Sequence, residues 1–70
     1  MRSPAVVLDA ILKVAPDLEP RFASTVSSMK YAAPEMQGQF WHRIAAILND
    51  CARDHPKKAE IAAIFAGENQ

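Results

Sequence analysis

The sequence predicts an all-α fold, a compact four-helix domain, and three observations lead to it. Apolar residues recur at the three- and four-residue spacing of helices along the chain. No segment alternates between polar and apolar residues with the period of two that is typical of strands. Four of the five prolines fall where a helix can begin, because the missing N–H of proline costs no intrahelical hydrogen bond in the first turn. The predicted helices span about residues 4–15, 18–32, 34–53 and 56–66.

The first two helices each combine a start signal with an apolar stripe. Ser3 can cap the first, and Pro4 presets its first residue; Pro16 ends it. Asp17 is placed to cap the second, in which Pro20 still falls within the first turn. The stripes are Leu8, Ile11, Leu12 and Ala15 in the first helix and Leu18, Phe22, Val26, Met29 and Ala33 in the second. Both segments are therefore predicted to bury one face.

The third helix has the clearest amphipathic pattern and is predicted to be the longest. It begins at Pro34, and its stripe is Met36, Phe40, Ile44, Ile47, Leu48 and Cys51. The fourth is short and follows Pro56, and Gly67 is expected to end it in the left-handed conformation. Its stripe is Ile61, Ile64 and Phe65. Short connections keep sequential helices adjacent in space.

Composition limits both the size of the core and the classes of partner. Residues 1–70 form one domain, and thirteen of the thirty-five apolar residues are alanine, so few large side chains fill the core. Eight acidic and eight basic residues balance, which provides no net attraction to nucleic acids or anionic membranes. The apolar stretch over residues 6–15 is too short to span a bilayer and lacks the basic flank of a secretory signal. With a single cysteine as well, the chain is predicted to be cytoplasmic.

No residue pattern in the sequence predicts catalysis or cofactor binding. Cys51 and His55 are four residues apart, but the residue before Pro56 is biased out of the helical conformation, so thiol and imidazole are not expected to meet. Together with Asp54 and His42 they make no recognised metal-ligand spacing. We therefore predict no enzyme, no metal site and no cofactor.

The first and last helices are more apolar than a lone chain of this size requires. Asp9 and Lys13 are the only charged residues over 4–15, and residues 61–66 are all apolar. A helix that is apolar around its circumference must be covered on all sides. We predict a homodimer that associates through Val6, Val7, Ala10, Val14, Ala62, Ala63, Ile64 and Ala66. The alternative is a central first helix, with alanines in the last helix that reflect helix propensity alone.

Aromatic and basic residues outside the stripes predict a second surface, for a protein partner. Trp41 is one position off the line of its helix, and Tyr31 lies across a short turn from it. Lys57 and Lys58 occupy the first turn of the last helix, where positive charge opposes the helix dipole. The predicted set is Tyr31, Trp41, His42, Arg43, Arg53, Lys57 and Lys58. The alternative for Trp41 is a residue at the rim of the core, which it covers. The alternative for the basic residues Arg53, Lys57 and Lys58 is a solvated loop.

Two classes of function follow from these patterns. The first is a small non-enzymatic protein–protein interaction module that self-associates and acts as an adaptor, regulator or inhibitor of another macromolecule. Such a short, alanine-rich chain would suit an accessory protein of a phage or plasmid. The alternative is a helix-turn-helix DNA-binding regulator that reads bases with the third helix, through Gln37, Gln39, His42 and Arg43. The balanced charge favours the first class.

Overall fold

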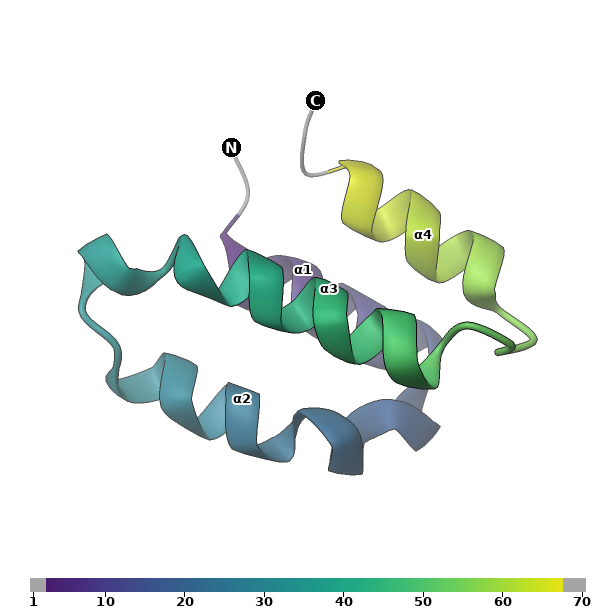
Figure 1. Cartoon of the computed structure of the whole chain (residues 1–70), viewed down its shortest axis with the longest axis horizontal. Helices are drawn as coiled ribbons and strands as arrows, with labels where there is room; N and C mark the ends of the chain where they lie inside the picture. The colour runs from purple at the N-terminus through teal and green to yellow at the C-terminus, as the bar shows by residue number, and fades with distance from the viewer. Residues whose placement is uncertain (1–2, 68–70) are drawn as a thin grey trace.

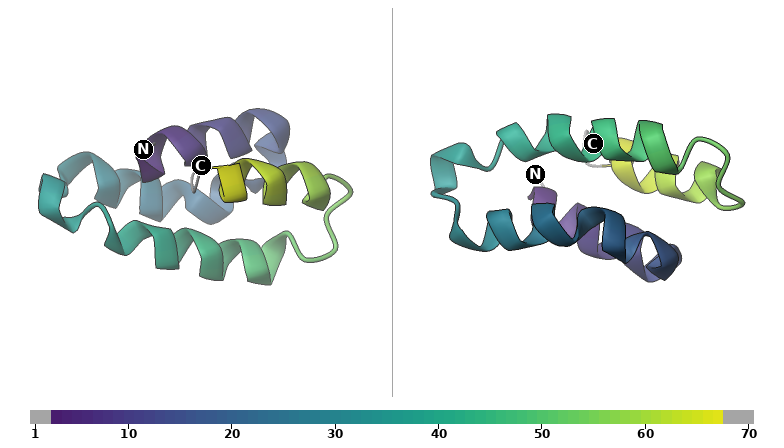
Figure 2. Two further views of the ribbon diagram at one scale, coloured as in Figure 1. Left: turned by 90° about the horizontal axis from the view of Figure 1, so that it is seen from above. Right: turned by 60° about the horizontal axis from the view of Figure 1, so that its bottom comes forward.

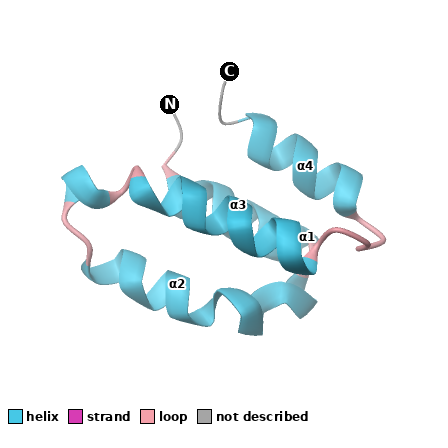
Figure 3. Cartoon of the chain, in the orientation of Figure 1, coloured by secondary structure: helices cyan, strands magenta, loops and turns pink. Residues whose placement is uncertain are grey.

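The computed structural model describes residues 3–67 and confirms the all-α four-helix prediction. The helices are α1 (Pro4–Val14), α2 (Glu19–Tyr31), α3 (Gln39–Cys51) and α4 (Lys58–Gly67) (Figure 1). Two short 3-10 turns, η1 (Pro16–Leu18) and η2 (Pro34–Met36), precede α2 and α3. Within the described residues all regular structure is helical, and loops make the connections (Figure 3).

The helices pair along their lengths, and α1 has the most partners. The most extensive contacts join α1 to α4 and α2 to α3, and α1 also contacts α2, α3 and η1. By comparison, the backbones of α3 and α4 make few contacts with each other. Figures 1 and 2 show α2 and α3 side by side in opposite directions, and the end of α4 near the beginning of α1. The chain therefore closes on itself through its first and last helices.

The core is small and is built around α1. Ser3 caps this helix as predicted, because its hydroxyl oxygen accepts a hydrogen bond from the backbone N–H of Val6 at 3.3 Å. The buried apolar side chains are Val7, Leu8, Ile11, Ala15, Leu18, Phe22, Met29, Phe40, Ile44, Ala52 and Ile61. Of these, only Ile61 comes from α4. Of the four α-helices, α4 thus contributes the fewest fully buried side chains to the core.

The predicted helix over 34–53 is wrong at its beginning. Pro34 opens η2, and a turn follows before α3 starts at Gln39, so α3 has the same length as α2. Proline fixes one φ angle, which suits a 3-10 turn as well as an α-helix, and Gly38 next to α3 weakens helix continuity. Met36 consequently stays 42% exposed and does not extend the buried stripe of α3.

Two predicted end signals are also wrong. Asp17 makes no capping hydrogen bond, because its carboxylate contacts His55 instead. Gly67 is the last residue of α4, and no glycine within residues 3–67 has a positive φ angle. The ends of these helices are therefore set by packing and chain geometry more than by the expected caps.

Neighbouring valines in α1 provide a test of its central position. Val7 is 0% exposed and Val6 is 51% exposed. We expect Val7→Ala to lower the free energy of unfolding by about 2 kcal/mol, from lost burial and the cavity left behind. Val6→Ala removes the same atoms from the surface and should stay within about 0.5 kcal/mol of the unmodified protein. Urea unfolding followed by circular dichroism measures both, and equal effects would contradict a core centred on α1.

Candidate functional site

An apolar groove with a volume of about 510 Å³ runs between α3 and α4. Its walls are apolar apart from one amide and two basic side chains. The lining residues are Ala45, Leu48, Asn49, Ala52 and Arg53 on the side of α3, and Lys58, Ala59, Ile61, Ala62 and Phe65 on α4. The groove is therefore a solvent-open apolar channel between two antiparallel helices.

Alanines on both sides contribute to the openness of the groove. Four alanines line it, Ala45 on α3 and Ala52 just after it, and Ala59 and Ala62 on α4, together with the larger Leu48, Ile61 and Phe65. Two packed helices normally fill the space between them with larger side chains that interdigitate. Single methyl groups do not reach across it, so α3 and α4 leave room for side chains from elsewhere.

The two ends of the groove differ in chemistry. At the end where α4 finishes, Trp41 and Phe65 pack edge to face, with ring centroids 5.8 Å apart and an interplanar angle of 71°. At the end where α3 finishes, the basic side chains of Arg53 and Lys58 line the walls. The groove is thus bounded by an aromatic pair at one end and by two cations at the other.

The predicted partner-binding set is divided between this groove and a second surface. Tyr31 and Arg43 line a shallow hollow of about 420 Å³ at the corner where α2 turns into α3, together with Met36, Gln39 and Phe40. Tyr31 is 87% exposed there, and the Arg43 guanidinium donates a hydrogen bond to the Ser24 hydroxyl at 3.5 Å. The structure therefore brings together Tyr31 with Arg43, and Arg53 with Lys58, as two separate pairs.

The remaining members of that set line neither hollow. Trp41 is half-buried against Phe65, which is the rim position considered as its alternative. His42 is exposed on α3, and Lys57 contributes its backbone N–H to a hydrogen bond with His55. The single surface predicted from the sequence is therefore replaced by two smaller ones.

The flank of α1 predicted for self-association is largely covered by α4. Leu12 and Val26 line one hollow between α1 and α2, so this flank of α1 faces α2. Ala10 and Val14 do not line that hollow and are half-buried, and the most extensive contacts of α1 are those with α4. Val7 is excluded from any association surface, because its side chain is fully buried inside the chain.

Other residues of the predicted association surface remain accessible. Val6 is about half exposed at the beginning of α1, and Ala62, Ala63 and Ala66 are exposed on α4. Ile64 is half-buried and packs against the core. The apolar surplus of the two helices is thus reduced in the folded chain but is not eliminated.

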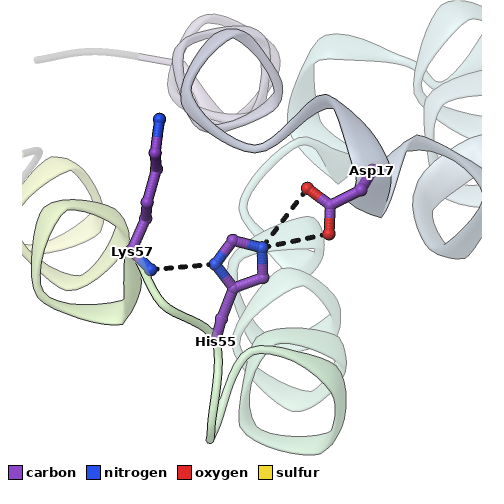
Figure 4. A network of polar contacts seen from close by, with 3 residues as sticks. All are labelled: Asp17, His55 and Lys57. Atoms are coloured by element: carbon purple, nitrogen blue, oxygen red, sulfur yellow. Dashed lines mark hydrogen bonds and ion pairs between the residues drawn. The ribbon is translucent and has the colours of Figure 1, made fainter.

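A histidine–carboxylate pair connects the α3–α4 loop to η1 (Figure 4). The Nε2 atom of His55 lies 3.0 Å and 3.3 Å from the two carboxylate oxygens of Asp17, and Nδ1 accepts a hydrogen bond from the backbone N–H of Lys57 at 3.0 Å. Because Nδ1 is the acceptor, the neutral ring carries its proton on Nε2 and donates it to Asp17. Both ring nitrogens are therefore engaged, which suits a structural contact and leaves no lone pair for a substrate proton.

The structure also bears on metal ions and membranes. Within residues 3–67, no three His, Cys, Asp or Glu side chains come close enough together to hold a metal ion. None of the helices in the described part of the chain combines the length and the apolar character needed to cross a membrane.

The geometry of α2 and α3 differs from that of a helix-turn-helix motif. In that motif two helices meet at a steep angle across a turn of three or four residues. Here residues 32–38 connect them, and α2 and α3 lie antiparallel (Figure 1). This arrangement gives no support to the alternative of DNA reading by α3.

Sequence reasoning missed most of the groove, although one signal for it was present. Trp41, Ala45, Leu48 and Ala52 recur at intervals of four, three and four residues, which makes a second apolar stripe beside the buried one on α3. On α4, Ala59 and Ala62 are three residues apart. A helix with two apolar stripes needs two neighbours, and this pattern could have predicted a second contact face.

No protein-family model, curated protein or solved structure matches this chain.

The His55–Asp17 pair is expected to contribute more to stability than the exposed pair between Lys13 and Asp9, whose charged atoms are 3.4 Å apart. The His55 side chain is 11% exposed, whereas Lys13 and Asp9 are 78% and 70% exposed. A double-mutant cycle of Asp17→Ala and His55→Ala should give a coupling energy of about 1 kcal/mol. The control cycle of Asp9→Ala and Lys13→Ala should give about 0.3 kcal/mol. A coupling at Asp17 no larger than the control would show that the pair does not hold the loop.

Proposed function

We propose that this chain is a non-enzymatic protein–protein interaction module that receives a helix of another protein in the groove between α3 and α4. One observation carries the proposal: a solvent-open, mainly apolar groove lies between two antiparallel helices, and alanines from both sides line it. Filling such a space with side chains from a third helix buries apolar surface that water otherwise covers. As an adaptor, regulator or inhibitor, the chain would act by binding such a helix of its partner.

The dimensions of the groove suit an amphipathic helix. Ala45 and Ala52 are two helical turns apart, so the apolar channel on α3 extends over about 10 Å. Helix-in-groove recognition uses anchors on successive turns of one helix face, and two to three turns supply enough of them. Trp41 and Phe65 at one end add aromatic surface of the kind that dominates binding energies at interfaces.

The arrangement of the titratable groups supports a binding role more than a catalytic one. The close histidine–carboxylate pair has both ring nitrogens of His55 engaged, so it has no acceptor left for general base catalysis. Cys51 is half-buried on α3, behind the groove-lining stripe.

Self-association through the outer face of α1 and α4 is the second part of the proposal. Val6 is exposed near the beginning of α1, and Ala63 and Ala66 are exposed near the end of α4; these two helix ends lie close together in Figure 2. Exposed side chains of both signs also occur on these two helices, such as Lys13 on α1 and Glu60 on α4. In a two-fold symmetric dimer the cations of one copy can meet the anions of the other.

A charge placed on this outer face should weaken the dimer. We expect the unmodified protein to form dimers at micromolar concentration in sedimentation equilibrium, and Ala63→Glu to shift it to monomer with its helix content unchanged. Ala46→Glu introduces the same side chain at an exposed alanine of α3, away from this face, and serves as the control. A monomeric unmodified protein at high micromolar concentration would refute self-association.

Blocking the groove should abolish recognition of helices. A displayed library of 14-residue amphipathic helices, with a fixed apolar stripe and random flanking positions, is expected to yield sequences that bind the unmodified protein and alter the fluorescence of Trp41, its single tryptophan. Ala62→Gln places a long side chain in the groove and should lower their affinity about tenfold or more. Ala46→Gln should leave it unchanged.

Two outcomes would contradict the helix-binding proposal. One is a library that yields no binding helices. The other is a set of selected helices that binds the Ala62→Gln and Ala46→Gln proteins equally well.

A further inference from the structure

We infer that the groove between α3 and α4 selects an acidic partner: an amphipathic helix whose apolar face ends in carboxylate side chains that contact Arg53 and Lys58. This inference rests on the proposed function, because it specifies which helix the groove receives. Two observations support it: two unpaired cations line the groove, and the acidic residues near them in sequence do not line it.

Both cations lie on the groove without an anionic partner in the described chain. Over residues 3–67 the ion pairs are Lys13 with Asp9 and His55 with Asp17, and neither involves Arg53 or Lys58. Lys58 is also the first residue of α4, where its charge adds to the positive end of the helix dipole. A carboxylate placed there would relieve this repulsion and would gain charge-assisted hydrogen bonds.

The acidic residues nearby in sequence do not neutralise the groove. Asp50, Asp54 and Glu60 are exposed, and none of them is among the residues that line it. On their helices Asp50 and Glu60 occupy positions away from the apolar stripes that face the groove. The chain is neutral overall, whereas this channel contains two cations and no carboxylate.

The charges favour such a partner over a second copy of this chain in the same groove. The apolar face of α4 covers residues 61–67, which contain no carboxylate. On α1, Asp9 already pairs with Lys13. The acid next to these apolar residues of α4 is Glu60, which follows Lys57 and Lys58, so that end of a second copy's helix carries net positive charge and would be repelled by Arg53 and Lys58 of the groove.

The partner is also expected to bind in one orientation. Phe65, packed edge to face against Trp41, lines the opposite end of the groove. A helix with large apolar anchors at one end and carboxylates at the other matches both ends only when it lies in one direction. The groove would thus select partners by the order of apolar and acidic residues along a helix.

Charge reversal at the groove tests this inference. Helices selected from the displayed library against the unmodified protein should be enriched in Asp and Glu at one end of the apolar stripe. Their affinity should fall about tenfold or more in a protein carrying Arg53→Glu and Lys58→Glu. It should also decrease as sodium chloride is raised, because the contacts lie at a solvent-open rim.

A matched variant separates this local effect from total charge. Arg21→Glu and Lys30→Glu change the net charge by the same amount at exposed positions of α2, outside the groove, and should leave the affinity within about twofold. Circular dichroism of both double variants establishes that each is folded. A repeat selection against the Arg53→Glu and Lys58→Glu protein should yield helices with Lys or Arg in place of the acids.

The remaining outcomes are distinguishable from one another. Helices that bind the groove without acidic enrichment, or that bind both double variants equally, would overturn the inference and leave the proposed function intact. A protein that dimerises through the groove, so that Ala62→Gln disperses the dimer, would show that a second copy is the occupant and would also overturn it. A library without any binders would overturn the proposed function itself.

Discussion

The packing of α1 is the constraint on which the rest of the structure depends. Each of the other three α-helices contacts α1, and α1 contributes Val7, Leu8 and Ile11 to the core. A chain of this length can surround only one helix, because most of its surface remains in water. Because α1 is the central helix, α3 and α4 meet at the Trp41–Phe65 contact and leave a groove lined partly by alanines beside it. The groove between them is therefore a consequence of how a thin core is shared among four helices.

Much of the fold could be predicted from the sequence because proline positions and apolar stripes are local signals. Pro4 marks the beginning of α1 correctly, and the existence of all four helices follows from spacing. The same local signals fail at Pro34, because a proline suits the beginning of a 3-10 turn as well as that of an α-helix. The prediction that Val7 lies on an association surface is wrong, because a stripe in the sequence does not show which flank of a helix a later helix will cover. Packing among distant segments decides these points, and single-sequence patterns do not contain it.

The candidate site was harder to predict than the fold. Its cations, Arg53 and Lys58, belong to the predicted partner-binding set, whereas of the alanines that line it only Ala62 belongs to a predicted surface, that of self-association. The contact between His55 and Asp17 joins residues 38 positions apart. Asp17 fits a capping role on local grounds, so nothing near it in the sequence indicates that its partner lies in the α3–α4 loop. Sites made from two helices and a loop become visible only when the elements are placed in space.

Because α4 contributes the fewest fully buried side chains of the four α-helices, it is expected to unfold locally before the rest of the domain. This helix contributes one fully buried side chain, Ile61, and it shares little backbone contact with α3. Elements with few buried contacts detach by local unfolding at a smaller energetic cost than the whole domain. Amide hydrogens of α4 should consequently exchange with solvent sooner than those of α1. A ligand that bridges α3 and α4 would slow that exchange, so molecular recognition and the local folding of the final helix are thermodynamically linked.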